Sequence, residues 1–235
     1  MRFLGRRYWP LVGVFGLALG FIVQAASADT AGANNKVIIY PGPGDSIDQL
    51  KQQGVEKVDN YGSYWVAEVG DKDLVRVNAM FGSRAVSASN LNRIELRAAS
   101  IDTTGNGPTV PAGMEQVESP GPRLRIVQFK GPIRPEWLAK LKSVSEARII
   151  NYIPNNAYLV RLDQAAEEKL RATQGANGPI QWIGAYHPYY KIQPGLLKGD
   201  VQDGESLVNV RIGMVTGPDA GRTNSKDICR YCSMR

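Results

Sequence analysis

The chain has little of the chemistry on which metal sites and many enzymes depend. In 235 residues it contains two cysteines, Cys229 and Cys232, and a single histidine, His187. Without a cysteine before position 229, a disulfide framework is excluded as the basis of the fold. The Cys-x-x-Cys spacing could suit a redox pair or zinc, but such a redox pair normally opens a helix after a strand, and zinc needs two further ligands. We therefore interpret both cysteines as incidental thiols.

Motifs of the common catalytic classes are also absent. The sequence has no Gly-x-Ser-x-Gly turn to expose a serine, no His-Glu-x-x-His pair for a metal and no Gly-x-x-x-x-Gly-Lys phosphate loop. His187 could titrate near neutral pH, but hydrolytic chemistry also needs a nucleophile and an orienting carboxylate. We expect a non-catalytic His187 and a chain that is not an enzyme and uses no metal or cofactor.

The excess of positive charge is small and dispersed. The net charge of +6 includes three arginines in the first 28 residues, so the remainder carries +3. Basic side chains are mixed with acidic ones, as in the segment that holds Arg134, Glu136, Lys140, Lys142 and Glu146. Such mixing is typical of a solvated helix face, and we expect no nucleic-acid partner.

The N-terminus has the three parts of a secretory signal peptide. A stretch with three arginines precedes the uncharged apolar run Leu11–Val23, and small residues follow up to Ala28. This order predicts a signal peptide over residues 1–28, with cleavage between Ala28 and Asp29. As a helix the run would span only about 20 Å, against roughly 30 Å for a bilayer core, so an uncut anchor is the weaker alternative. We expect an exported protein, periplasmic or extracellular, without membrane contact after cleavage; the export route stays open.

An internal repeat runs along the rest of the chain. Three strand-like runs are each followed by a Gly-Pro pair, and these pairs begin at positions 42, 131 and 217. Asn60-Tyr61 in the first copy corresponds to Asn151-Tyr152 in the second. We predict a first unit over residues 36–98, a second over 124–195 and the start of a third within 196–235. Residues 99–123, with four prolines and four glycines, read as an exposed linker.

Each complete copy is predicted to contain, in order, strand, helix, strand, strand, helix and strand. The predicted elements of the second copy are Leu124–Phe129, a helix with Pro135 in its first turn, Ala147–Tyr152, Ala157–Leu162, Gln164–Thr173 and Ile180–Gly184. Those of the first copy are Val37–Tyr40, Ser46–Gln53, Val55–Asn60, Ser63–Val69, a helix from Asp71 and a strand near Arg84–Ser89. This order is that of a ferredoxin-like split βαβ fold. The predicted class is α+β, as tandem ferredoxin-like units whose antiparallel sheets carry two helices on one face.

Local signals in the second copy support these boundaries. Asp163 can cap the second helix, and Asn155-Asn156 suits a turn with left-handed backbone geometry. Within that helix we expect Ala166 and Leu170 to face the core and Glu167 to stay in water.

The segment Trp182–Ile192 is rich in aromatic residues. One interpretation is a contact surface for a partner protein, with Tyr186, His187, Tyr189 and Tyr190 as candidate binding residues. The other is that these aromatic side chains cover their own sheet. Both alternatives remain open at this point.

Three segments together resemble a known family: Gly131–Leu138, Tyr152–Val160 and Trp182–Ile192. They are similar to the N-terminal prodomain region of bacterial subtilisin-like serine proteases of the fervidolysin-like type. The resemblance covers residues 124–195 and, more faintly, 36–98. It implies ferredoxin-like propeptide modules that assist folding of the protease domain and keep it inactive.

The catalytic Asp, His and Ser of that family have no counterpart in this chain. The resemblance therefore implies a non-catalytic fragment that binds a subtilisin-like protease domain, in cis within a longer protein or in trans. The abrupt stop of the third copy and the tail Ser225–Arg235 suggest a truncated or frameshifted reading. The alternative is a free-standing secreted protein-binding module or an independent protease inhibitor.

Overall fold

The computed structural model describes residues 35–105, 107–118, 121–144, 147–175, 178–197 and Gly213. The predicted signal peptide with its cleavage site at Ala28 and Asp29, both cysteines and nearly all of the third copy lie outside these residues. Within the described ranges, none of the helices has the length and apolar character needed to cross a membrane.

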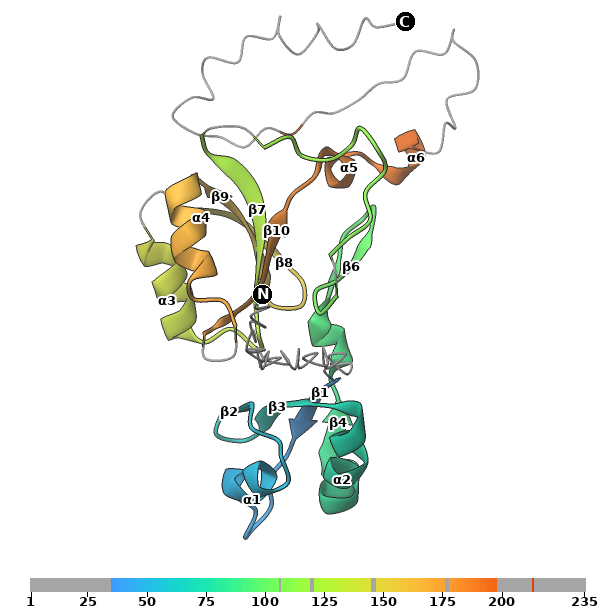
Figure 1. The fold of residues 1–235 in the computed structure, drawn as a ribbon, viewed down its shortest axis with the longest axis vertical. Coiled ribbons are helices and arrows are strands. Elements are labelled where there is room, and N and C mark those ends of the chain that lie inside the picture. The colour runs from blue at the N-terminus through green and yellow to red at the C-terminus, as the bar shows by residue number, and fades with distance from the viewer. Residues whose placement is uncertain are drawn as a thin grey trace, which may run out of the picture. The chain divides into compact units, whose positions relative to one another are not determined.

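The described residues form an α+β structure with two four-stranded antiparallel sheets (Figure 1). The first sheet has the strand order β2-β3-β1-β4, and each neighbouring pair is antiparallel. Its elements are β1 (Asn35–Ile39), α1 (Ile47–Gln52), β2 (Val58–Asn60), β3 (Trp65–Val69), α2 (Asp71–Phe81), the 3₁₀ turn η1 (Gly82–Arg84) and β4 (Ala85–Ser87). Helices α1 and α2 cover one face, where Leu50 and Val77 pack with Val37 and Trp65 in one apolar core.

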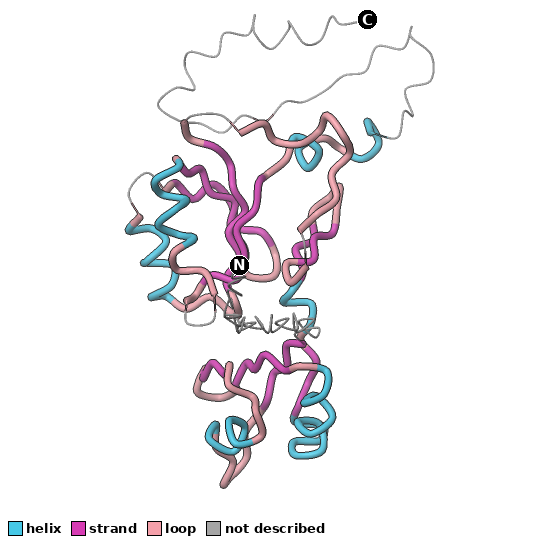
Figure 2. The backbone as a smooth tube through the Cα atoms, viewed as in Figure 1, coloured by secondary structure: helices cyan, strands magenta, loops and turns pink. Residues whose placement is uncertain are grey.

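The second sheet has the strand order β10-β7-β9-β8, again with antiparallel neighbours. Its elements are β7 (Arg123–Phe129), α3 (Pro135–Ser143), β8 (Arg148–Ile153), β9 (Ala157–Leu162), α4 (Gln164–Arg171) and β10 (Ile180–Ala185). Figures 1 and 2 show α3 and α4 side by side on one face of this sheet. There Leu141 and Leu170 pack against Phe129 and Val160.

Local sequence signals account for several of these boundaries. Helix α1 begins at a capping box, in which Ser46 accepts from the backbone N–H of Gln49 and the Gln49 side chain accepts from that of Ser46. Pro135 is the first residue of α3, and Asp163 accepts a hydrogen bond of 2.7 Å from the backbone N–H of Ala166. Asn155 and Asn156 have φ of 65° and 64°. The predicted cap and left-handed turn of the second copy are thus confirmed.

One predicted exposure on α4 is wrong. Glu167 was expected to stay in water, but only 6% of its surface is exposed. Its carboxylate accepts from Arg125 at 2.8 Å and from Arg171 at 2.7 Å. Hydrogen bonds from guanidinium groups make the burial of this carboxylate possible.

The predicted linker over residues 99–123 is also partly wrong. A two-stranded hairpin, β5 (Arg93–Glu95) with β6 (Ser100–Asp102), crosses its expected start. Ile94 and Ile101 are paired in this hairpin and fully buried. They pack against Ile126 and Leu159 on the face of the second sheet opposite α3 and α4, which we call its outer face. The apolar positions of the hairpin therefore make it a cover for the second sheet.

The repeat correspondence of Asn60-Tyr61 with Asn151-Tyr152 is not kept in the sheets. Asn60 pairs with Trp65, whereas Tyr152 pairs with Tyr158. Trp65 and Tyr158 are each the first residue of their strand, β3 or β9, that packs with the core under the helices. Their strand partners, Asn60 and Tyr152, therefore occupy equivalent positions. The register of β8 shifts between Ile149 and Asn151. A bulge with one extra residue explains the offset of one position.

Candidate functional site

The four aromatic-segment residues predicted to bind a partner lie together. Tyr186 ends the extended segment after β10, and His187 precedes the short helix α5 (Pro188–Lys191). Their rings gather around Tyr190, with centroid distances of 6.0 Å from Tyr186, 5.4 Å from His187 and 5.9 Å from Tyr189.

These four residues, Tyr186, His187, Tyr189 and Tyr190, form what we call the aromatic turn. It covers the outer face of its own sheet. Tyr190 is 5% exposed and belongs to a second apolar cluster, which consists of Ile94, Ile101, Ile126, Ile153, Ala157, Leu159 and Tyr190. Tyr186 and Tyr189 are half-buried and pack against this cluster. Burial raises the pKa of Tyr190 to about 12. Tyr190 is therefore a core residue, while Tyr186 and Tyr189 keep surface that a partner could contact.

His187 has a structural partner. Its Nδ1 accepts a hydrogen bond of 2.9 Å from the backbone N–H of Gln116, and its ring lies edge-on to Tyr190. Partial burial holds the pKa of His187 below its ordinary value. Across the described ranges, no three His, Cys, Asp or Glu side chains gather in a way that could hold a metal ion. The geometry of His187 is that of a hydrogen-bond acceptor for the neighbouring segment.

A buried ion network anchors that neighbouring segment. Arg125 on β7 is 3% exposed and donates to Glu167 at 2.8 Å. The same guanidinium donates to Gln116 at 2.9 Å and to Glu118 at 2.8 Å. Through these ion pairs and hydrogen bonds, Arg125 links α4 to the segment of Gln116 and Glu118, which also contacts His187.

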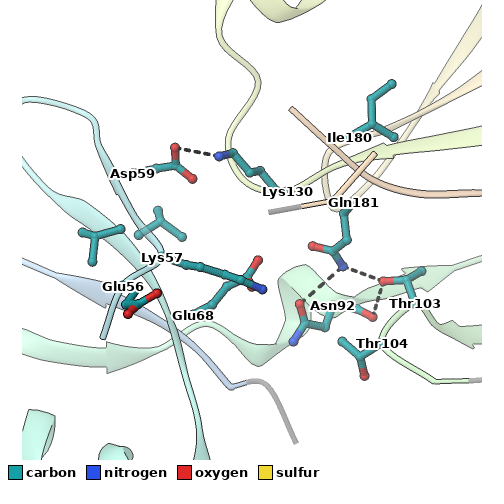
Figure 3. Close-up of a pocket in the computed structure, with 13 residues that line it drawn as sticks. Glu56, Lys57, Asp59, Glu68, Asn92, Thr103, Thr104, Lys130, Ile180 and Gln181 are labelled. Carbon is teal, nitrogen blue, oxygen red and sulfur yellow. Dashed lines mark hydrogen bonds and ion pairs between the residues drawn. The ribbon is translucent and has the colours of Figure 1, made fainter. Parts of the chain in front are cut away.

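Residues from both sheets line a polar pocket of about 550 Å³, which no pattern in the sequence indicated (Figure 3). The first sheet contributes Asp59 and Glu68, with Lys57 just before β2. The other wall contains Thr103, Lys130 and Gln181. Lys57 pairs with Glu68 at 3.0 Å, and Lys130 pairs with Asp59 at 3.0 Å. The Nε2 of Gln181 donates to Thr103 at 2.7 Å. These polar groups pair with one another, so the ion pairs and hydrogen bonds around the pocket connect the two sheets.

A buried lysine lies beside this junction. Lys36 on β1 is 1% exposed, and its Nζ donates to the backbone oxygen of Lys130 and to Oε1 of Gln181. Burial lowers the pKa of Lys36 to about 8, although the carboxylates of Glu68 and Asp59 act in the opposite direction. Because Lys36 and Gln181 are 145 residues apart, no local sequence signal could have predicted this contact.

An aromatic contact joins the sheets on the other side of Lys130. The Tyr61 hydroxyl donates to the backbone oxygen of Pro132 at 2.9 Å, and the Arg134 guanidinium lies 4.4 Å from the Tyr61 ring centroid. A side chain at Gly131 would meet the Tyr61 hydroxyl at 2.8 Å. A residue with a Cβ at position 131 would therefore displace the Tyr61 hydroxyl from its place beside this Gly-Pro pair.

The comparisons with known proteins identify one region of the chain. Residues 95–187 match a family model described as a domain of unknown function, DUF8729. The match begins at the last residue of β5 and ends at His187, so it contains the second sheet together with most of the chain that covers its outer face. Curated proteins and solved structures gave no match.

Proposed function

We propose that this chain is a non-catalytic, prodomain-like protein built from two ferredoxin-like units in tandem. Its partner would be an exported subtilisin-like serine protease, which it would assist in folding and hold inactive by binding. The single observation that carries the proposal is the strand order. Both sheets follow the sequence β-α-β-β-α-β with the first strand central, the third beside it and all neighbours antiparallel.

The three segments that resemble the prodomain family have defined places in the fold, which supports the proposal. Gly131–Leu138 contains the loop that contacts Tyr61 and the first turn of α3. Tyr152–Val160 forms the turn between β8 and β9, and Trp182–Ile192 covers the outer face of the second sheet. All three shape the second unit and its junctions.

The contact surface differs from a simple open sheet, because the hairpin and the aromatic turn already cover the outer face of the second sheet. The half-buried Tyr186 and Tyr189, followed by α6 (Pro194–Leu197), are the better candidates for contact. Extended segments and rigid aromatic side chains are common means of binding a partner protein.

Inhibition tests the proposal directly. The full mature chain, residues 29–235, is titrated into a purified bacterial subtilisin while cleavage of a chromogenic peptide is followed. We expect the subtilisin to slow and trypsin, a serine protease of another fold, to be unaffected. Binding should also stabilise the chain by about 2.7 kcal/mol when free protease is at 100 times the dissociation constant. Equal rates with and without the chain, and no thermal shift, would contradict the prodomain proposal.

A matched pair of tyrosine variants tests the contact surface. Tyr189→Ala should weaken inhibition by about tenfold, because loss of an interface aromatic costs more than 1 kcal/mol. Tyr152→Ala is the control, since Tyr152 is 49% exposed and lies outside the aromatic segment. If a folded Tyr189→Ala variant inhibits as well as Tyr152→Ala, the aromatic turn is not the contact surface.

A further inference from the structure

The segment 110–118, which we call the strap, is held against the aromatic turn. Val110 packs against the second apolar cluster at one end of the strap. In its middle, the backbone oxygen of Met114 accepts from the backbone N–H of Tyr189 at 3.4 Å. The strap therefore covers part of the same apolar surface as Tyr186 and Tyr189.

Two further anchors of unlike chemistry hold the strap. The first is Arg125, which donates to the side chains of Gln116 and Glu118. A guanidinium keeps its charge at every physiological pH, so the arginine side of this anchor stays charged in mild acid. The second is His187, whose Nδ1 accepts from the backbone N–H of Gln116 at 2.9 Å.

The bond at His187 exists only when the ring is neutral. Protonation turns both ring nitrogens into donors, which leaves the Gln116 N–H facing another N–H. Charges on each neighbouring element act on the ring. Glu115 and Glu118 on the strap favour the protonated form, whereas Arg125 on β7 and Lys191 on α5 oppose it. Partial burial is the largest influence and holds the pKa of His187 below its ordinary value of 6.5.

We propose that His187 is a pH-sensitive latch, which keeps the strap closed while neutral and releases it when protonated. With the strap released, His187 would titrate near its ordinary value, but with the strap closed it binds a proton less readily. The closed form is therefore fully stabilised above pH 6.5 and loses stability as the pH falls from 6.5 through the lower pKa of the closed form. Release uncovers apolar surface near Val110, Tyr186 and Tyr189. The latch is independent of the proposed protease partner.

The chain offers a direct measurement, because His187 is its only histidine. In the mature chain, made without a histidine tag, NMR follows the one imidazole signal from pH 8 to pH 5. Hydrogen exchange of the Gln116 amide is measured over the same range and corrected for intrinsic rates. We expect an imidazole pKa below 6.5 and an exchange rate for Gln116 that is roughly threefold or more faster at pH 5 than at pH 7.5.

Two substitutions separate the latch from other effects of acid. His187→Asn places an amide oxygen near the position of Nδ1 and does not titrate, so the Gln116 amide should stay protected at both pH values. His187→Ala should leave it unprotected at both. If protection is lost in acid in the His187→Asn variant as well, carboxylate pairs such as Glu118 with Arg125 are responsible and the latch is disproved. An imidazole that titrates at 6.5 with unchanged Gln116 protection would disprove it equally.

Discussion

The two sheets have the same strand order, but their outer faces differ in chemistry and in cover. On the first sheet, Lys36 pairs across strands with Glu68, and the face meets the rest of the chain through charged and amide groups. On the second sheet, the matching place of Lys36 is taken by Leu124, and the face is apolar and covered by the hairpin and the aromatic turn. The two sheets thus share one strand order, and the side chains on each outer face determine which part of the chain packs against it.

A second difference lies on the helix side of the sheets. Val37 pairs with Ala67 in the first sheet, and Arg125 holds the matching position opposite Val160 in the second. On the following helices, Leu74 and Glu167 each lie four residues after the N-cap. An apolar pair beside the first sheet therefore corresponds to a buried ion pair beside the second.

The largest expected effect comes from breaking that ion pair. Arg125→Val alone should lower the free energy of unfolding by about 3–5 kcal/mol, because it leaves the Glu167 carboxylate buried with less compensation. The double variant Arg125→Val with Glu167→Leu copies the apolar pair of the first sheet and should recover most of this loss, since apolar replacements of buried ion pairs are often neutral or better. Urea unfolding of the single and double variants measures both. If the double variant is no more stable than Arg125→Val alone, the two positions are not equivalent to Val37 and Leu74.

Removing the buried charge of the first sheet should have a smaller effect that depends on pH. The pKa of Lys36 is about 8 in the fold and 10.5 ordinarily, so the unfolded chain binds the proton more readily between these values. Wild-type stability should therefore rise from pH 8 to pH 10.5, by roughly 3 kcal/mol at most, and Lys36→Met should lack this rise.

Urea unfolding at several pH values checks this prediction, with Lys72→Met as the control at an exposed lysine of α2. The pKa of Tyr61, raised by burial to about 12, lowers stability above pH 10 in every variant, so the comparison uses differences between variants. A Lys36→Met variant whose pH profile parallels the wild type would show that the charge of Lys36 costs nothing.

The smallest expected effect concerns the helix caps. Asp163 caps α4 with its side chain, whereas Gly70, the N-cap of α2, provides no side-chain bond. Asp163→Ala should cost about 1 kcal/mol, and Gly70→Ser should gain a few tenths of a kcal/mol. Thermal unfolding of both variants measures the difference. Equal and negligible changes would mean that tertiary packing alone sets the starts of these helices.

Local features of the fold could be predicted from the sequence, and long-range ones could not. The cap at Asp163 and the left-handed turn at Asn155 and Asn156 follow from the chemistry of single residues, and both are present. The burial of Glu167 depends on Arg125, which is 42 residues away. The burial of Lys36 likewise depends on Gln181, so the residues of its own strand could not have predicted it.

The candidate site shows the same limit. The sequence drew attention to Tyr186, His187, Tyr189 and Tyr190, and the structure places their rings together. Aromatic composition could not show that Tyr190 is a core residue, because self-packing and partner packing use the same side chains. The polar junction was missed because its members come from distant segments, each of which is unremarkable alone.

The hairpin of β5 and β6 has a consequence for synthesis on the ribosome. It leaves the exit tunnel before β7 and β9, so Ile94 and Ile101 have no sheet to pack on until residues as far as Leu159 have emerged. At about 5–20 residues per second, this delay lasts several seconds, during which two apolar side chains stay open to other nascent chains. The second sheet thus has a cover that is synthesised before the surface on which it packs.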